Sequence, residues 1–125
     1  MAASTLISVV DDDPSMSRML ARIITAAGFD VQAFPSAEAF LQSGRIDESA
    51  CLILDVDLPG MNGLELQQEL NDSGRALPII FISAEATEAM QRKMLDSGAI
   101  GFFKKPFSID SLLTKVRSVE SLTLI

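Results

Sequence analysis

The sequence predicts a single α/β domain built on a doubly wound, five-stranded parallel sheet with helices on both faces. Short apolar runs alternate with stretches of helical periodicity along the chain, which is the pattern of repeated βα units. The 125 residues, of which 48% are hydrophobic and 22% charged, fit one globular domain spanning 1–125. Because right-handed crossovers restrict the topology, we expect the flavodoxin-like strand order 2-1-3-4-5.

Five apolar runs are the expected strands. They span residues 6–10, 31–34, 51–54, 79–82 and 100–103. The third and fourth runs are continuously apolar, as expected of strands that helices cover on both faces. The second run ends in Phe34 and Pro35 without a charged residue, which suits an edge strand outside a polar site.

The first and last helices have clear ends and clear apolar stripes. Asp13 is the expected N-cap of the first helix, Pro14 fits its first turn, and Gly28 ends it. Its stripe recurs at helical spacing and consists of Met16, Met19, Leu20, Ile23 and Ile24. Ser108 caps the last helix. The stripe of that helix consists of Ile109, Leu112, Leu113, Val116 and Val119. Residues 120–125 are expected to form a tail or the start of a linker.

The three middle helices are shorter. Ser36 opens one of them, and Leu66 and Leu70 mark the next before Gly74. The helix at 87–97 has a thin apolar stripe of Met90, Met94 and Leu95. We therefore expect it to be the least firmly docked helix.

Composition excludes several classes of function. A formal net charge of −7 repels phosphate backbones and anionic membranes, so we expect no direct nucleic-acid or membrane binding. The absence of His, Tyr and Trp excludes Ser-His-Asp systems and histidine-bound zinc. The single Cys51 lies in an apolar run and fits a buried thiol. No signal-peptide pattern and no apolar run of about 18 residues is present, so we expect a cytoplasmic protein.

Polar residues follow four of the five predicted strands. Asp11 and Asp12 follow the first, Asp55 the third, Ser83 the fourth, and Lys104 and Lys105 the fifth. The carboxyl ends of parallel strands meet at one edge of the sheet, where such sheets bind ligands. The sequence therefore predicts one crevice that contains carboxylates, a hydroxyl and at least one ammonium group.

The chemistry of this crevice favours a metal-assisted phosphoryl site. Crowded carboxylates retain protons unless a cation neutralises them, and an all-oxygen set suits a hard ion such as Mg²⁺. Such an ion bridges carboxylate and phosphate oxygens, and an aspartate can form an acyl phosphate. Asp55 is central in this interpretation, and a lysine opposite it would pair with a phosphate oxygen.

Each of these residues also has a purely structural interpretation. Asp11 and Asp12 fit a solvated charge run, Asp55 a turn residue, Ser83 a turn hydroxyl and Lys105 a surface charge. Only the shared edge of the sheet favours the functional interpretation. Gly60 and Gly63 fit turn geometry, since no phosphate-cradling glycine motif is present.

Four segments together resemble the receiver domain of two-component response regulators. They are VVDDD at 9–13, LDVDLPGMNG at 54–63, FISA at 81–84 and FKKPF at 103–107. The resemblance covers nearly the whole chain. GF at 28–29 and SAEAFL at 36–41 are similar to the FixJ-type subgroup.

The resemblance implies a phosphoprotein of phosphorelay signal transduction. Asp55 would accept a phosphoryl group from a histidine kinase or a phosphotransfer protein. Mg²⁺, or Mn²⁺ in its place, would be held by Asp11, Asp12, Asp55 and the backbone carbonyl of Asp57. The domain would not be an enzyme in the usual sense, because it catalyses only its own phosphorylation and dephosphorylation.

The resemblance also implies a conformational switch. Lys105, which precedes Pro106, is at the position of the family's lysine, and Ser83 would bond to the phosphoryl group. Phe102 is at the position of the switching aromatic residue. The switch would repack the face formed by the helix at 87–97, the strand at 100–103 and the last helix, and a homodimer could form there. Asp57 and Glu85 stand where the family tunes the lifetime of the acyl phosphate.

Two other functions remain open from the sequence. A haloacid-dehalogenase-type phosphatase is one, because the spacing of Asp55 and Asp57 also fits a nucleophile and an acid two residues apart. That fold is larger, however, and gives no role to the acidic pair after the first strand. A phosphorylation-independent interaction module is the other. The chain fits either a stand-alone receiver or a receiver separated from an effector domain.

Overall fold

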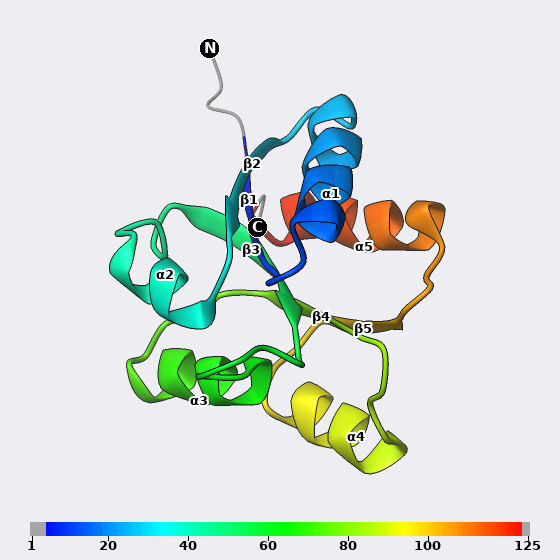
Figure 1. Cartoon of the computed structure of the whole chain (residues 1–125). Coiled ribbons are helices and arrows are strands. Elements are labelled where there is room, and N and C mark those ends of the chain that lie inside the picture. Colours follow the sequence, from blue (N-terminus) through cyan, green and yellow to red (C-terminus); the bar gives the residue numbers. More distant parts are fainter. Residues whose placement is uncertain (1–4, 124–125) are drawn as a thin grey trace.

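The computed structural model describes residues 5–123 and has the predicted architecture. Five parallel strands form one sheet in the order β2-β1-β3-β4-β5, which confirms the doubly wound topology (Figure 1). The strands are β1 Leu6–Val10, β2 Asp30–Phe34, β3 Ser49–Asp55, β4 Ile79–Ser83 and β5 Gly101–Lys104. Each differs from its predicted range by at most two residues at either end.

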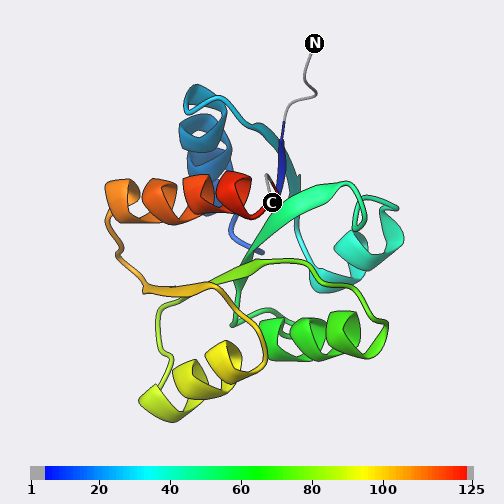
Figure 2. The same cartoon turned by 180° about the vertical axis from the view of Figure 1, so that it is seen from behind.

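Helices cover both faces of this sheet. They are α1 Pro14–Ala26, α2 Ala37–Gln42, α3 Gly63–Asp72, α4 Glu88–Asp96 and α5 Ile109–Thr123. α1 and α5 lie on one face, whereas α2, α3 and α4 lie on the other (Figures 1 and 2). This three-layer arrangement buries β3 and β4 on both sides, as their continuous apolar runs predict.

The central strand divides the hydrophobic core in two. Leu52 and Leu54 of β3 belong to the core on the α2–α3–α4 side, whereas Cys51 and Ile53 belong to the core on the α1–α5 side. All four side chains have no exposed surface. Successive side chains of a strand point to opposite faces, so one strand contributes to both cores.

The predicted helix caps are confirmed. The Asp13 carboxylate accepts a hydrogen bond from the backbone N–H of Ser15, and Ser36 Oγ accepts one from Ala39. Ser108 Oγ accepts from the N–H of Ser111 at the start of α5. α5 continues to Thr123, so most of the segment predicted as a tail or linker at 120–125 is helical, and its last two residues lie outside the described residues.

The α4 helix is docked by one buried residue and by hydrogen bonds from α3. Met94 is fully buried, but Leu95, which the sequence placed in the apolar stripe, is 49% exposed. The buried side chain of Gln67 donates from Nε2 to the carbonyl of Met94 at 3.0 Å. Asn71 Nδ2 donates to the carbonyl of Ser97 at 2.9 Å. These side-chain bonds from α3 reach only the C-terminal end of α4.

Candidate functional site: an acidic cluster beside a lysine

Strand register places the predicted site residues together. Val10 of β1 pairs with Leu54 of β3, so the residues that follow them, Asp11 and Asp55, are neighbours. Asp55 pairs with Ile82 of β4, which brings Ser83 to the same edge. Ser83 in turn pairs with Lys104 at the end of β5. Three separate hydrogen-bonded pairings therefore assemble the site.

Three carboxylates form a compact cluster at this edge. One carboxylate oxygen from each of Asp11, Asp12 and Asp55 lies within 4.8 Å of the others. Asp11 and Asp55 are buried, whereas Asp12 is exposed. A cavity of about 250 Å³ borders Asp11 and Asp12 but not Asp55. Hard oxygen donors at this spacing fit a hexacoordinate Mg²⁺ that retains several waters.

Lys105 is the cation that faces this cluster. Its Nζ lies 3.4 Å from Asp11 Oδ2 and 3.5 Å from Asp55 Oδ2. Both distances exceed the 2.7–2.9 Å typical of a tight ammonium–carboxylate hydrogen bond. One ammonium group balances only one of the three carboxylate charges. About two negative charges remain, and one divalent cation would balance them. The donor set therefore fits a divalent metal in both geometry and charge.

The surroundings of the cluster shift two pKa values. Burial and the neighbouring Asp11 carboxylate raise the pKa of Asp55, and they outweigh the opposing effects of the Asp57 N–H and of Lys105. Burial alone would lower the pKa of Lys105, but the Asp55 and Asp11 carboxylates raise it overall. The pKa of Asp55 is thus raised because its charged form is poorly solvated and close to a like charge.

Asp57 and Ser83 contact each other directly. The backbone N–H of Asp57 donates to Asp55 Oδ1 at 3.1 Å. The fully buried Ser83 donates from Oγ to Asp57 Oδ2 at 2.9 Å, and it accepts from the N–H of Glu85 at 3.1 Å. The sequence singled out all these residues but gave no sign of the Asp57–Ser83 hydrogen bond, because the two positions are 26 residues apart.

Phe102 lies in β5, where its backbone pairs with Phe81 of β4. Its side chain is half-buried and packs against the core on the α2–α3–α4 side. Phe103, the next residue, packs on the opposite core. Phe102 therefore lies on the face of the sheet that α4 covers, as the switch interpretation requires.

Glu38 is a site-supporting residue that the sequence analysis did not identify. Its Oε2 accepts a hydrogen bond from the backbone N–H of Met61 at 2.9 Å, which ties α2 to the loop after Asp55. A Cβ at Gly60, where φ is +72°, would lie 2.7 Å from the same oxygen. A Cβ at Gly63 would lie 2.6 Å from the Asp55 carbonyl. The two glycines thus permit the close approach of this loop to α2 and to β3.

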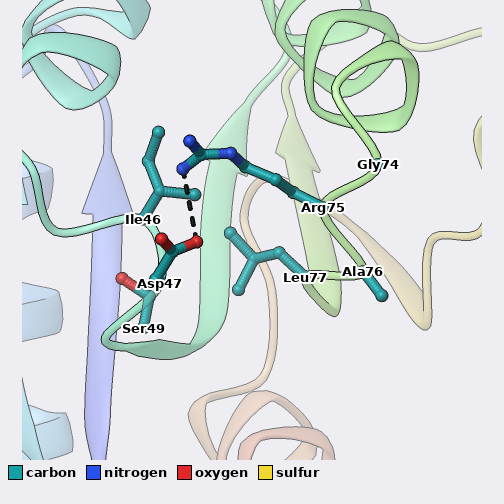
Figure 3. Close-up of a pocket in the computed structure, with 7 residues that line it drawn as sticks. All are labelled: Ile46, Asp47, Ser49, Gly74, Arg75, Ala76 and Leu77. Carbon is teal, nitrogen blue, oxygen red and sulfur yellow. Dashed lines mark hydrogen bonds and ion pairs between the residues drawn. The ribbon is translucent and has the colours of Figure 1, made fainter.

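A second pocket lies at the opposite edge of the sheet. It has a volume of about 260 Å³, and Arg75 Nη1 lies 3.3 Å from Asp47 Oδ1 at its wall (Figure 3). Ser49, which also lines it, begins β3, whereas Asp55 ends that strand. The strand separates this pocket from the acidic cluster by about 20 Å, from a rise of about 3.3 Å per residue.

Comparison with known proteins identifies the family. Residues 7–117 match the response regulator receiver domain. The chain belongs to this receiver-domain family. It is 37% identical over 119 residues to the response regulator protein TodT of Pseudomonas putida, covering 95% of this chain and 52% of TodT. The family assignment replaces the haloacid-dehalogenase-type phosphatase considered from the sequence.

Solved structures agree with this assignment. The response regulator StyR superimposes with a TM-score of 0.88 at 38% identity, covering 96% of this chain and 61% of StyR. The structure titled FixJ-N superimposes with a TM-score of 0.83 at 28% identity, covering 96% of both chains. The predicted resemblance to FixJ-type receivers is confirmed.

Receiver domains are signalling domains rather than classical enzymes, and they partner with histidine kinases. The chain spans about half the length of the curated relatives that it matches. Across residues 5–123, no helix combines the length and the apolar character needed to cross a membrane.

Proposed function

We propose that this receiver domain accepts a phosphoryl group on Asp55 from a histidine kinase or a phosphotransfer protein. The observation that supports this most directly is the meeting of the Asp11, Asp12 and Asp55 carboxylates within 4.8 Å of one another, with Lys105 facing Asp11 and Asp55. Its location at the carboxyl ends of β1 and β3 is where doubly wound sheets bind ligands. We propose the cytoplasm as the location of this reaction.

In the transfer step, a carboxylate oxygen of Asp55 attacks the phosphorus of a phosphohistidine. The new P–O bond forms as the P–N bond breaks, and the imidazole leaves with the electron pair of that bond, neutral when its other nitrogen bears a proton. Lys105 then pairs with a phosphoryl oxygen, which its long contacts to Asp11 and Asp55 leave it free to do.

Asp11, Asp12, Asp55 and the backbone carbonyl of Asp57 are the proposed metal ligands. Bound Mg²⁺ would neutralise charge on the phosphoryl oxygens, and Mn²⁺ would serve the same purpose. The hydrogen bond from the Asp57 N–H to Asp55 Oδ1 holds the residue that supplies the carbonyl next to the phosphoacceptor.

The proposed output is a change of the α4–β5–α5 face. Ser83 would donate to the phosphoryl group, and the half-buried Phe102 would move inward as α4 repacks. Only Met94 of α4 is fully buried, and the side-chain hydrogen bonds from α3 reach one end of the helix. These few contacts would allow α4 to shift. A homodimer through this face is the proposed consequence.

The central experiment is chemical phosphorylation. The protein is incubated with acetyl phosphate and Mg²⁺, and an adduct of about 80 Da, the mass of one phosphoryl group, is located by peptide mass spectrometry. We expect it on Asp55, and we expect none in Asp55→Asn or in the presence of EDTA. Asp47→Asn, which changes an exposed acid at the opposite edge, is the matched control and should retain the adduct.

A protein that stays unmodified, or an adduct at another residue, would refute the proposal. The interaction-module alternative is tested with the same variant. The affinity of a partner is measured for wild type treated with acetyl phosphate and for Asp55→Asn. Equal affinities would show that phosphorylation does not control partner binding by this domain.

A further inference from the structure

The Ser83 hydroxyl has a single proton, and it already donates that proton in a hydrogen bond to Asp57. The side chain lies at the end of β4 with no exposed surface. Its Oγ donates to Asp57 Oδ2 at 2.9 Å, and the N–H of Glu85 donates to Oγ at 3.1 Å. A hydroxyl can donate only one hydrogen bond. Ser83 therefore cannot donate to a second acceptor while the Asp57–Ser83 hydrogen bond is intact.

We infer that the Asp57 carboxylate restrains Ser83 in the unphosphorylated conformation, and that phosphorylation proceeds to a switched state only when the phosphoryl group displaces Asp57 as the acceptor. This inference rests on the proposed function, because the competing acceptor is the phosphoryl group on Asp55. It assigns Asp57 a side-chain role that is separate from the proposed metal-binding role of its carbonyl.

The geometry makes Asp57 well suited to this role. Its backbone N–H is tied to Asp55 Oδ1, while its side chain is tied to Ser83, so one residue contacts both the phosphoacceptor and the switch residue. Hydrogen bonds to a charged acceptor are stronger than those between neutral groups. The Asp57–Ser83 hydrogen bond thus favours the unphosphorylated arrangement.

Release of Ser83 is also feasible. Asp57 is exposed, so water can solvate its carboxylate after the hydrogen bond breaks. The hydroxyl can rotate toward the new acceptor, which carries more negative charge than a carboxylate. The competition is therefore between two anions for one proton, and the balance between them sets how readily the switch responds.

The test measures how Asp57 and Ser83 affect each other. Beryllofluoride with Mg²⁺ mimics a phosphoryl group on a carboxylate, and its affinity is measured by titration calorimetry. The proteins are wild type, Asp57→Ala, Ser83→Ala and the double variant. Asp57→Ala removes both the restraint and a repulsive charge, whereas the same change in the Ser83→Ala background removes the charge alone.

We expect Asp57→Ala to tighten binding about tenfold more in the wild-type background than in the Ser83→Ala background, the factor that corresponds to about 1.4 kcal/mol. Glu85→Ala is the matched control, because it removes a flanking carboxylate but keeps the N–H that bonds to Ser83. Its effect should be the same in both backgrounds.

Equal tightening by Asp57→Ala in both backgrounds would overturn the inference while leaving the proposed function intact. Failure of the wild type to bind beryllofluoride would instead refute the proposed function. A second readout needs neither metal nor phosphate. In metal-free protein, Asp57→Ala should shift the NMR signal of the Glu85 amide, since its acceptor Ser83 is released, and an unchanged signal would contradict the restraint.

Discussion

Asp55→Asn should stabilise the metal-free domain, although it removes the proposed phosphoacceptor. The carboxylates of Asp11 and Asp12 lie within 4.8 Å of Asp55 in the cluster, and Lys105 Nζ lies 3.5 Å from it. At an effective dielectric constant of about 20, a like charge at that separation costs about 3.5 kcal/mol and Lys105 offsets about 4.7 kcal/mol. Solvent screens the exposed Asp12, so these charge–charge energies nearly cancel, and burial of the charged Asp55 carboxylate leaves a net cost of about 1–2 kcal/mol.

The pH dependence follows from the raised pKa of Asp55, whose main cause is burial. The unfolded chain releases this proton at its ordinary pKa of about 3.9, before the folded protein does. As the pH rises through the window between the two values, the wild type loses stability relative to Asp55→Asn. Above the folded-state pKa the difference is constant, and below the unfolded-state pKa it disappears.

The assay is urea unfolding followed by circular dichroism, in EDTA, at about pH 7 and about pH 3, on either side of the ordinary carboxyl pKa. At the higher pH the Asn variant should be more stable by about 1–2 kcal/mol, which corresponds to a melting temperature higher by about 5 °C. Saturating Mg²⁺ should reduce the gap, because it binds the folded wild type. An Asn variant no more stable than the wild type at the higher pH, or a gap that persists at the lower pH, would refute the electrostatic reasoning.

Three further predictions concern the metal, the acyl phosphate and α4. Mg²⁺ should raise the melting temperature of the wild type and do so much less for Asp11→Asn; equal rises would exclude Asp11 as a ligand. Asp57→Asn and Glu85→Ala should change the decay rate of the phosphoryl adduct more than its rate of formation, and unchanged lifetimes would remove their tuning role. Gln67→Leu should cost about 1 kcal/mol in urea unfolding through a lost hydrogen bond. It should also speed amide hydrogen exchange in α4, and unaltered exchange would show that this bond does not hold the helix.

Much of the fold was predictable because its signals are local. The caps at Asp13, Ser36 and Ser108 bond to amides two or three residues away, so the sequence alone identifies them. The start of β3 was missed because Ser49 is polar. Its hydroxyl donates to the carbonyl of Arg45 and also hydrogen-bonds to Ser8 of β1, which is 41 residues away in sequence and becomes a neighbour only in the folded sheet.

The composition of the site was predictable for a different reason. Parallel strands bring their carboxyl ends to one edge whatever their side chains are, so the topology alone places Asp11, Asp55, Ser83 and Lys105 together. The individual hydrogen bonds were not predictable. Glu38 accepts a hydrogen bond from Met61, 23 residues away, and that contact depends on the close approach of α2 to the loop after Asp55.

Electrostatic repulsion in the site favours the binding of a cation, whereas one hydrogen bond in the site favours the unphosphorylated conformation. Crowded carboxylates repel one another, and this favours any ligand that supplies positive charge. The Asp57–Ser83 hydrogen bond stabilises the unphosphorylated state. A metal relieves the repulsion but leaves Ser83 bound to Asp57, because the metal offers no acceptor. A phosphoryl group offers that acceptor. Binding of the metal and conformational switching are therefore separable steps. The backbone carbonyl of Asp57 would take part in the first, and its side chain, which bonds to Ser83, would control the second.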